Sequence, residues 1–423
     1  MGINKKEMID MKTNILVGIT ISLLLLALPA AASDYTLEIF GNANEDGEIN
    51  MVDVTYAELI IMERNDETQL ADAKYDGELD ILDVTQIELI ILGRENQLTL
   101  IDMADRIVTV PRPIERVVPA GLLDGVRTLI QLGAADKIVG ISNYAKNYAL
   151  KPSDYCSPIR DAAPELKDLP DVGGYTNPNI EVIASLKPDV VFEYAAIPDV
   201  ADAIQEKTGI PVVCISSSQF DFDMHRIVGT VMGKEERAEE LISYANEKTD
   251  EVTEVTSEIP EDEKPKVYCV SGCGGRSAIT QTWGRYDPIN IAGGINVAEE
   301  CVIGSGSSIV SKEQIIAWNP DRILIHGVSP PHAISIDDVL SDPDLQTVNA
   351  VKNRDVNYTK GYMIGWDPAT GLTECFYMAK LFHLDEFEDL EEEEEGNEIL
   401  ETFYGVEGLY TEMLDLSDRY RWD

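Results

Sequence analysis

The stretch Glu181-Val-Ile-Ala-Ser-Leu-Lys-Pro-Asp189 has a similar copy 132 positions later, Glu313-Gln-Ile-Ile-Ala-Trp-Asn-Pro-Asp321. In each copy a polar residue, Asn179 or Ser311, lies two places before the glutamate, where an N-cap accepts hydrogen bonds from free helix amides. Proline ends a short amphipathic helix in both copies, and the apolar run after the aspartate predicts a buried strand. Two such units predict two similar α/β lobes that bind something between them.

Length and charge limit the possible functions. The chain has 423 residues, enough for two or three domains with a large core. Its net charge of −44 argues against nucleic acid as a partner, because neutralising phosphates needs clustered Lys and Arg. A solvated surface suited to salty or cation-rich surroundings explains most of this acidity, and specific calcium sites explain part of it.

Residues 1–32 have the features of an export signal. Three lysines precede the apolar stretch 15–28, and Pro29 and three alanines follow it. The apolar stretch is short for a membrane span, although a retained N-terminal anchor stays open as an alternative. No cysteine follows the signal, which argues against a lipid anchor. The sequence therefore predicts an exported protein at the extracellular face of the membrane or on the cell surface.

Six cysteines in an exported chain permit up to three disulfides, or simple buried thiols. Cys269 and Cys273 flank a glycine-containing turn and form the pair most expected to lie close together. The spacing of the six does not match a zinc site; they are Cys156, Cys214, Cys269, Cys273, Cys301 and Cys375.

A second repeat lies near the front, where residues 42–61 and 72–91 match at 11 of 20 positions. Each copy follows a calcium-loop pattern, in which alternate oxygens surround a hard cation and glycine at position six permits a sharp turn. Lys74 cannot ligate at position three, so the second site is expected to be weak or empty, and acidic turns without metal remain the alternative. The candidate ligands are Asn42, Asn44, Asp46, Asn50 and Asp53 in the first loop and Asp72, Asp76, Asp80 and Asp83 in the second.

This duplicated loop–helix module, residues 33–98, resembles a dockerin, including Asp rather than Glu at position 12 of each loop. The resemblance implies a small all-α domain that holds calcium. It also implies a cohesin-like surface protein as a possible partner. The exit helices are expected to start at Val54 and Val84, and a short link at 93–99 to lead into the next domain.

The body of the chain alternates strands and helices, which predicts a mostly parallel sheet with covered faces. Residues 234–259 follow three-and-four apolar spacing without Gly or Pro and predict one long helix. Nine acids in residues 385–395 suggest a solvated link or helix face, and 404–422 a final helical segment. The predicted strands are 116–119, 137–141, 190–193, 211–215, 266–270, 323–326 and 356–358, and the predicted helices include 124–132 and 200–208.

Residues 99–384 resemble the ABC-importer solute-binding proteins that carry iron–siderophore complexes, haem and cobalamin. The resemblance implies an α/β fold of two Rossmann-like lobes, 99–233 and 261–384, joined by one long rigid helix, 234–260, with residues 385–423 as an acidic segment and C-terminal helix. Small opening motions are then expected. The motifs that carry it are Asp105-Arg-Ile-Val-Thr-Val-Pro111, Ile114-Glu-Arg-Val-Val118, Leu132-Gly-Ala-Ala-Asp-Lys-Ile-Val-Gly140, Val172-Gly-Gly174 and both Pro-Asp elements.

In that family an exposed glutamate on each lobe docks an arginine pocket of the membrane permease, which works with an ATPase. The matching positions are Glu181 and Glu313, the first acids of the two repeated helices. A carboxylate in a first helical turn is well placed for a bidentate arginine. The alternative is that both residues only satisfy their helix dipoles.

The ligand is expected beyond the carboxyl ends of the strands, as in other open α/β sheets. That rule indicates Tyr144 and Tyr194, and the 132-residue offset pairs Tyr194 with His326. Cobalamin-type relatives place an aromatic ligand contact where Tyr175 lies. Lobe two contributes Arg276, Ser307, which is the symmetry mate of Tyr175, and Trp366.

Two ligand classes fit these residues. The aromatic side chains suit a large planar or chelated ligand, such as a corrinoid, haem or siderophore complex. Arg276 and the Gly/Ser loops suit a small oxyanion such as molybdate or tungstate instead. Ser307 in place of an aromatic weakens the corrinoid alternative, and His326 with His332 could coordinate iron directly, unless both are structural.

No enzymatic motif is present. The sequence lacks a Gly-x-Ser-x-Gly elbow, a P-loop, His-Glu-x-x-His and Gly-x-Gly-x-x-Gly, and it has only four histidines. The prediction is a binding protein rather than an enzyme. The competing class is a dockerin-bearing surface scaffold or adhesion protein without a transport role.

Overall fold

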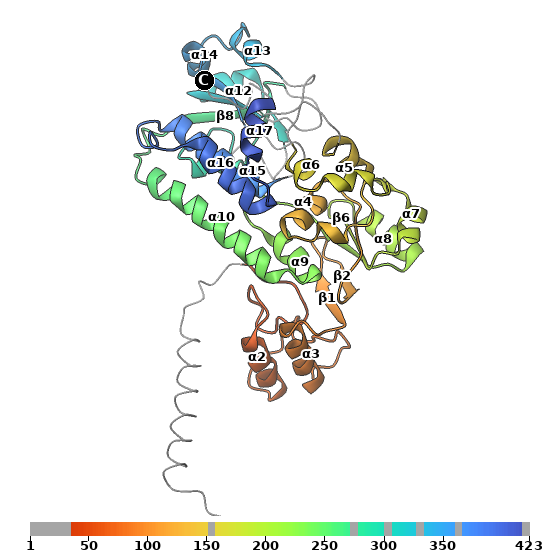
Figure 1. Cartoon of the computed structure of the whole chain (residues 1–423). Helices are drawn as coiled ribbons and strands as arrows, with labels where there is room; N and C mark the ends of the chain where they lie inside the picture. Colours follow the sequence, from red (N-terminus) through yellow and green to blue (C-terminus); the bar gives the residue numbers. More distant parts are fainter. Residues whose placement is uncertain are drawn as a thin grey trace, which may run out of the picture. The chain divides into compact units, whose positions relative to one another are not determined.

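The computed structural model describes residues 35–150, 157–270, 278–299, 307–326, 334–359 and 366–416 (Figure 1). The chain divides into two units, Met1–Ile91 and Leu92–Asp423. The predicted signal lies outside the described residues. Within them, no helix has both the length and the apolar character needed to cross a membrane.

The first unit contains two helices, α2 (Met51–Ile61) and α3 (Ile81–Ile91), which pack on each other through a small apolar core. Both begin three residues before the predicted starts. In α2 the reason is a capping box. The Asn50 side chain accepts from the Asp53 backbone amide, and the Asp53 carboxylate accepts from the Asn50 backbone amide. The helix therefore begins inside the loop rather than after it.

The second unit opens with a β-hairpin where the sequence predicted a link. Strand β1 (Gln97–Ile101) pairs antiparallel with β2 (Ile107–Pro111) over five residue pairs. The link at 93–99 was therefore too long, because Leu98, Thr99 and Leu100 are buried and pair with β2. The boundary between the units falls after Ile91, not at the predicted residue 98.

The first lobe is built on a parallel sheet in the order β3 (Val117–Pro119), β6 (Val190–Tyr194), β7 (Val212–Ile215). Its residues are almost fully buried, as expected of a sheet covered on both faces. Its other elements are α4 (Asp124–Gln131), α5 (Asn143–Tyr148), α6 (Pro158–Ala162), β4 (Gly173–Gly174), β5 (Asn177–Pro178), α7 (Ile180–Leu186), α8 (Pro198–Thr208) and α9 (Asp223–Met232), with the 3-10 helices η1 (Ala135–Lys137) and η2 (Pro164–Asp168).

The strand predicted at 137–141 is wrong. Residues Ala135–Lys137 form the 3-10 helix η1, and the following residues make only two isolated bridges. Ile138 bridges Val117, whereas Ile141 bridges Asp171. The segment thus changes partner within three residues, and no continuous ladder forms.

The second lobe has a six-stranded sheet in which β8, β12 and β13 are parallel and β9 and β11 are antiparallel additions. A fourth parallel strand, β10, pairs with β8. The sequence identified β8, β12 and β13 and missed β9, β10 and β11, which have only two or three residues each. The elements are β8 (Lys266–Val270), β9 (Gln281–Trp283), α11 (Asp287–Ile291), β10 (Ile295–Asn296), β11 (Ser307–Ile309), α12 (Lys312–Trp318), β12 (Arg322–Ile325), α13 (Ile336–Leu340), α14 (Asn349–Asn353) and β13 (Val356–Tyr358).

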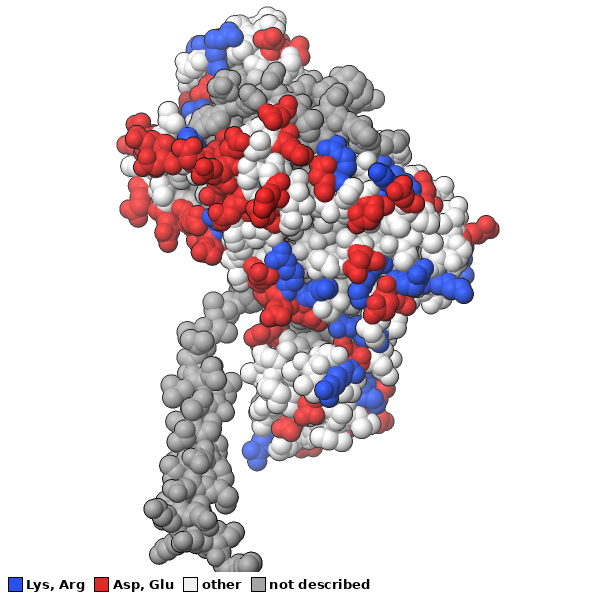
Figure 2. Space-filling model, viewed as in Figure 1, with Lys and Arg blue, Asp and Glu red and all other residues white. Residues whose placement is uncertain are grey.

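A long helix, α10 (Glu235–Thr256), lies in sequence between the two sheets and packs against α9 and α15 (Pro368–Phe382). Its bounds lie within the predicted 234–259. The chain then forms α16 (Glu392–Tyr404) and α17 (Leu409–Leu416), so the acidic run is partly helical, and α17 lies within the final helical segment predicted at 404–422. Gly405, at φ 70°, ends α16 one residue after Tyr404. Figure 2 shows acidic side chains gathered over α10 and α16.

The repeat found in the sequence forms the same local structure twice. Helices α7 and α12 both end on a left-handed residue, Lys187 (φ 49°) and Asn319 (φ 48°), just before the proline. The carboxylate of Asp189 then accepts from the Arg116 amide at 2.8 Å, and that of Asp321 from the Lys266 amide at 3.1 Å. Each aspartate therefore fastens the start of one strand (β6 or β12) beside the start of its neighbour (β3 or β8).

Candidate ligand site and docking surfaces

Three tyrosines predicted as ligand contacts lie together on the first lobe. Tyr144 is in the first turn of α5, Tyr175 is in the β4–β5 turn, and Tyr194 ends β6. The ring centroids of Tyr144 and Tyr175 are 5.6 Å apart, and those of Tyr175 and Tyr194 are 6.5 Å apart. All three side chains are half-buried. They form a continuous aromatic surface that can contact a ligand.

A buried acid, which sequence reasoning missed, lies directly beneath Tyr194. Glu193 has no solvent exposure, and its Oε1 accepts from the Tyr194 amide at 2.9 Å. Burial raises the pKa of this carboxyl to about 7. Gly121 makes room for it, because a Cβ there would be 3.3 Å from Glu193 Oε1 and 3.0 Å from the Tyr194 nitrogen.

A second aromatic group surrounds His326 in the other lobe. The ring of Trp283 stacks on Tyr286 at 5.4 Å and contacts His326 at 4.5 Å, and Tyr286 lies 6.3 Å from Trp366. The structure thus connects the predicted residues His326 and Trp366 through Trp283 and Tyr286, which the sequence analysis overlooked. The only sequence signal for this pair was that two aromatic residues, Trp283 and Tyr286, lie three positions apart at and after the end of a short strand.

His326 is a neutral, buried residue rather than an exposed one. Its side chain is 3% exposed, and desolvation lowers its pKa to about 3. A neutral imidazole keeps its capacity to bind a metal. His332 lies outside the described residues.

Of two other predicted contacts, Arg276 and Ser307, the structure describes only Ser307. Arg276 lies outside the described residues. Ser307 begins β11, where it pairs in register with Trp283 of β9. Its backbone therefore lies next to the aromatic group of the second lobe.

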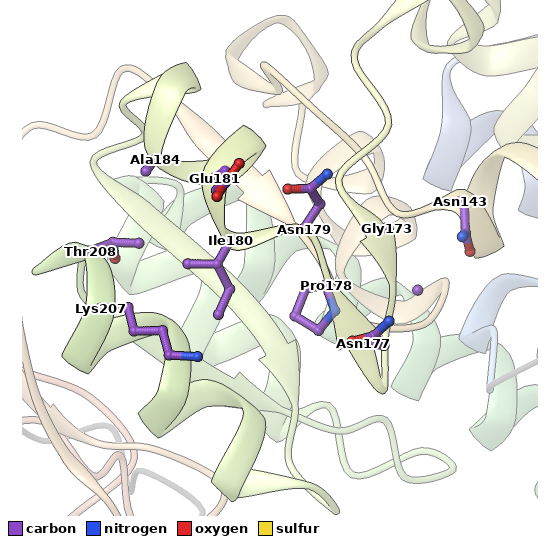
Figure 3. Close-up of a pocket in the computed structure, with 11 residues that line it drawn as sticks. Asn143, Gly173, Asn177, Pro178, Asn179, Ile180, Glu181, Ala184, Lys207 and Thr208 are labelled. Carbon is purple, nitrogen blue, oxygen red and sulfur yellow. The ribbon is translucent and has the colours of Figure 1, made fainter.

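Glu181 and Glu313 occupy matching positions in the first turns of α7 and α12, and both are exposed. The pKa of Glu313 is lowered by its own backbone amide and by the Ser311 hydroxyl, which keeps it ionised. Glu181 borders a surface groove of about 960 Å³ between α5, the β4–β5 hairpin and α8, drawn in Figure 3. Asn143, Asn177 and Asn179 line this groove together with Lys207 of α8.

The two predicted calcium loops have closely similar turns. In the first, Asp53 accepts from the amides of Asn44 (3.2 Å) and Asn50 (2.8 Å), and burial raises its pKa to about 6. In the second, Asp83 accepts from the matching amides of Lys74 and Asp80, but the Lys74 ammonium binds Asp76. Among the described residues, no three His, Cys, Asp or Glu side chains form a group that could hold a metal.

Three cysteines are free buried thiols, namely Cys214, Cys269 and Cys375. Burial raises the pKa of the Cys214 thiol to about 12, which makes it a poor nucleophile. Cys156, Cys273 and Cys301 lie outside the described residues, and with them the expected proximity of Cys269 and Cys273.

Two α/β lobes with aromatic groups beyond their strands define a solute-binding protein of the class that serves importers. A family model described as periplasmic binding protein matches residues 122–363, more than half of the chain, and the chain belongs to that family. This family supplies the solute-binding components of ABC transporters outside the cytoplasm.

Similar proteins bind different solutes. The chain is 26% identical to the molybdate-binding protein MolA of Haemophilus influenzae over 72% of this chain and 90% of MolA. It is 24% identical to the uncharacterised substrate-binding lipoprotein YvrC of Bacillus subtilis, over 61% of this chain and 77% of YvrC. A periplasmic solute-binding protein of Veillonella parvula has a similar structure, with a TM-score of 0.58, 26% identity and coverage of 74% and 94%.

Proposed function

We propose that this protein captures a metal complex of the iron-chelate, haem or cobalamin type between its lobes and delivers it to an ABC permease. The chain of ring contacts from Tyr144 through Tyr175 to Tyr194 carries the proposal. Aromatic faces stack on large planar or chelated ligands and bury much of their surface. In the other lobe the half-buried ring of Trp283 is a further candidate contact, and it packs on Tyr286, which with Trp366 is buried.

A small oxyanion such as molybdate or tungstate is the second candidate. The observation that favours it is the 26% identity to a molybdate-binding protein over most of both chains. Such a ligand needs hydrogen-bond donors rather than stacking surfaces, and Arg276 with the Gly/Ser loops would have to provide them.

Native mass spectrometry combined with metal analysis of the purified protein tests both candidates. The metal-complex proposal predicts a bound species of chelate, haem or corrinoid mass that is lost when Tyr144, Tyr175 and Tyr194 are all changed to Ala. Replacing Tyr244 of α10 is the matched control and should leave the cargo bound. A bound molybdate or tungstate would instead establish the second candidate.

We also propose that Glu181 and Glu313 dock the permease. Both carboxylates are exposed at equivalent helix starts, as a pair of arginine pockets would require. Glu181→Arg with Glu313→Arg should abolish uptake while ligand affinity stays unchanged. Glu247→Arg with Glu254→Arg, at two exposed positions of α10, is a charge-matched control that should support normal uptake. Loss of ligand affinity in the double variant would refute the docking role.

A third proposal concerns the first unit, where the first loop is the better calcium site. Its candidate ligands are Asn and Asp side chains, none of which carries a positive charge, whereas Lys74 puts an ammonium into the second loop. Calcium should raise the unfolding temperature, and Asp46→Ala should remove most of that rise while Asp76→Ala should not. An equal loss in both variants would contradict a preference for the first loop.

This unit would then tether the binder to a cohesin-like surface protein. Retention of the protein at the cell surface should depend on calcium and fall when residues 34–95 are deleted. Unchanged retention would count against tethering. The scaffold alternative gains support if a cohesin-like protein binds and none of the candidate solutes does.

A further inference from the structure

A buried polar network connects helix α4 of the first lobe to the start of α15. Its centre is Asp367, the N-cap of α15, which is 2% exposed. The Asp367 carboxylate accepts from Gln131 Nε2 at 3.0 Å, from Thr370 Oγ1 at 2.8 Å and from the Tyr404 hydroxyl at 2.8 Å. Donors on α4, α15 and α16 therefore converge on one carboxylate.

Arg127 of α4 supplies the positive charge of this network and is itself 4% exposed. Its Nε lies 3.8 Å from Asp367 Oδ2, and its Nη1 donates to Asp124 Oδ1 at 3.2 Å. The same Nη1 donates to the backbone oxygen of Trp366 at 3.0 Å. Burying three charges is costly, and such groups are retained only where partners and geometry compensate them.

Other residues also hold Trp366 in place, by its backbone amide and by its ring. Its backbone amide donates to Ser217 Oγ at 3.2 Å, and its ring packs edge-on against Phe220 at 5.1 Å. Gly371 lies against the ring, because a Cβ at that position would be 2.3 Å from Trp366 Cζ2. Ser217 and Phe220 follow β7 of the first lobe, so residues of that lobe hold Trp366 by both its backbone and its ring.

We propose that Arg127 is a positioning residue that fixes Trp366, and through it the aromatic group of the second lobe, relative to the first lobe. Arg127 acts through the Trp366 carbonyl and Asp367 and does not itself contact the solute. The inference rests on the proposed function only in treating Trp366 as part of the ligand site. Trp366 is 5% exposed and would act through the buried Tyr286 on the half-buried Trp283, so that this ring is already in place when a ligand arrives. A site that is already in place lowers the ordering cost of binding.

The test compares substitutions that separate charge from geometry. Arg127→Met leaves Asp124 and Asp367 without their buried cation and is expected to unfold part of the population. Arg127→Lys keeps the charge, but a single ammonium cannot reproduce the guanidinium's separate contacts with Trp366 and Asp367. The matched control is Arg106→Lys, because Arg106 also joins a carboxylate (Asp102) and a backbone oxygen (Val212) inside the first lobe.

The readout is the fluorescence of Trp366 alone, obtained by subtracting the spectrum of the same protein carrying Trp366→Phe. Arg127→Lys should shift this emission to longer wavelength and remove its shielding from acrylamide, while Arg106→Lys should leave both unchanged. Unaltered Trp366 emission in Arg127→Lys would overturn the proposal, and so would an equal change in Arg106→Lys. No ligand enters this measurement, so its failure is distinguishable from a failure of the proposed solute-binding function.

Discussion

Gly371 shows how a single residue shapes the predicted ligand site. The indole of Trp366 occupies the space that any larger side chain at 371 would need. Gly371→Ala should therefore displace Trp366 and lower the free energy of unfolding by about 1–3 kcal/mol, the usual cost of overpacking a core. Urea denaturation measures this, with Gly174→Ala as control, since a Cβ at 174 meets nothing closer than 3.7 Å. Equal stability of both variants would contradict the close packing.

His225 makes stability depend on pH. It is buried, it hydrogen-bonds Gln131 Oε1 at 2.9 Å, and desolvation lowers its pKa from 6.5 to about 3. As the pH falls, His225 is protonated in the unfolded chain near pH 6.5 but in the folded chain only near pH 3. The free energy of unfolding is therefore highest above pH 6.5 and decreases as the pH falls toward 3. At pH 5 the loss amounts to about 2 kcal/mol.

The measurement is urea unfolding at pH 7.5 and at pH 5 for the wild type and for His225→Gln. The wild type should lose about 2 kcal/mol more than the variant over this interval. The comparison cancels other titrating groups, including Glu193, whose raised pKa acts in the opposite direction. Identical losses in the two proteins would show that His225 does not titrate on unfolding.

The sequence indicated some residues of the candidate site and missed others. The rings of Tyr144, Tyr175 and Tyr194 are neighbours, and their role as ligand contacts stays a prediction. Tyr194 was found from the end of a real strand, β6, whereas Tyr144 was found from the predicted strand 137–141, which does not form. Trp283 and Glu193 were missed for different reasons. Trp283 ends a three-residue strand without a periodic signal, and Glu193 is a charged residue in a strand, whose burial depends on a neighbouring glycine.

At the scale of elements, the Pro-Asp turns are the most informative feature. The Asp189 carboxylate accepts from the amides of Glu115 and Arg116, both at 2.8 Å, and so sets the register between β6 and β3. Asp189→Ala should cost about 2 kcal/mol of unfolding free energy, since hydrogen bonds to a charged group are worth roughly 1.5–3 kcal/mol. Asp199→Ala, at an exposed position on α8, should cost little in the same denaturation experiment. A small effect at both positions would mean that the turn does not fix the strands.

Elements with strong local signals were predicted well, and those that depend on distant partners were not. Helix α10 could be recognised because 22 residues repeat one apolar spacing. The strand predicted at 137–141 has suitable residues, yet its two bridges go to different neighbours. Strands β9 to β11 exist only because β8 and one another offer hydrogen bonds, which no local pattern reveals.

At the scale of the whole molecule, the chain combines a small helical unit with a two-lobed solute-binding unit. Every described residue that we assign to solute or permease belongs to the second unit. The family follows from that unit, as the match over residues 122–363 shows. The identity of the solute does not follow from the family match and is tested by binding.

The most direct test of the central claim is calorimetric titration of the full chain with haem, cyanocobalamin, a ferric siderophore chelate and molybdate. The account predicts that one metal complex binds with one-to-one stoichiometry and that replacing Tyr144, Tyr175 and Tyr194 by Ala weakens it at least about a hundredfold, equivalent to roughly 2.8 kcal/mol. Tyr244→Ala should bind as the wild type does. Binding of none of the metal complexes, or undiminished binding by the triple variant, would contradict the account.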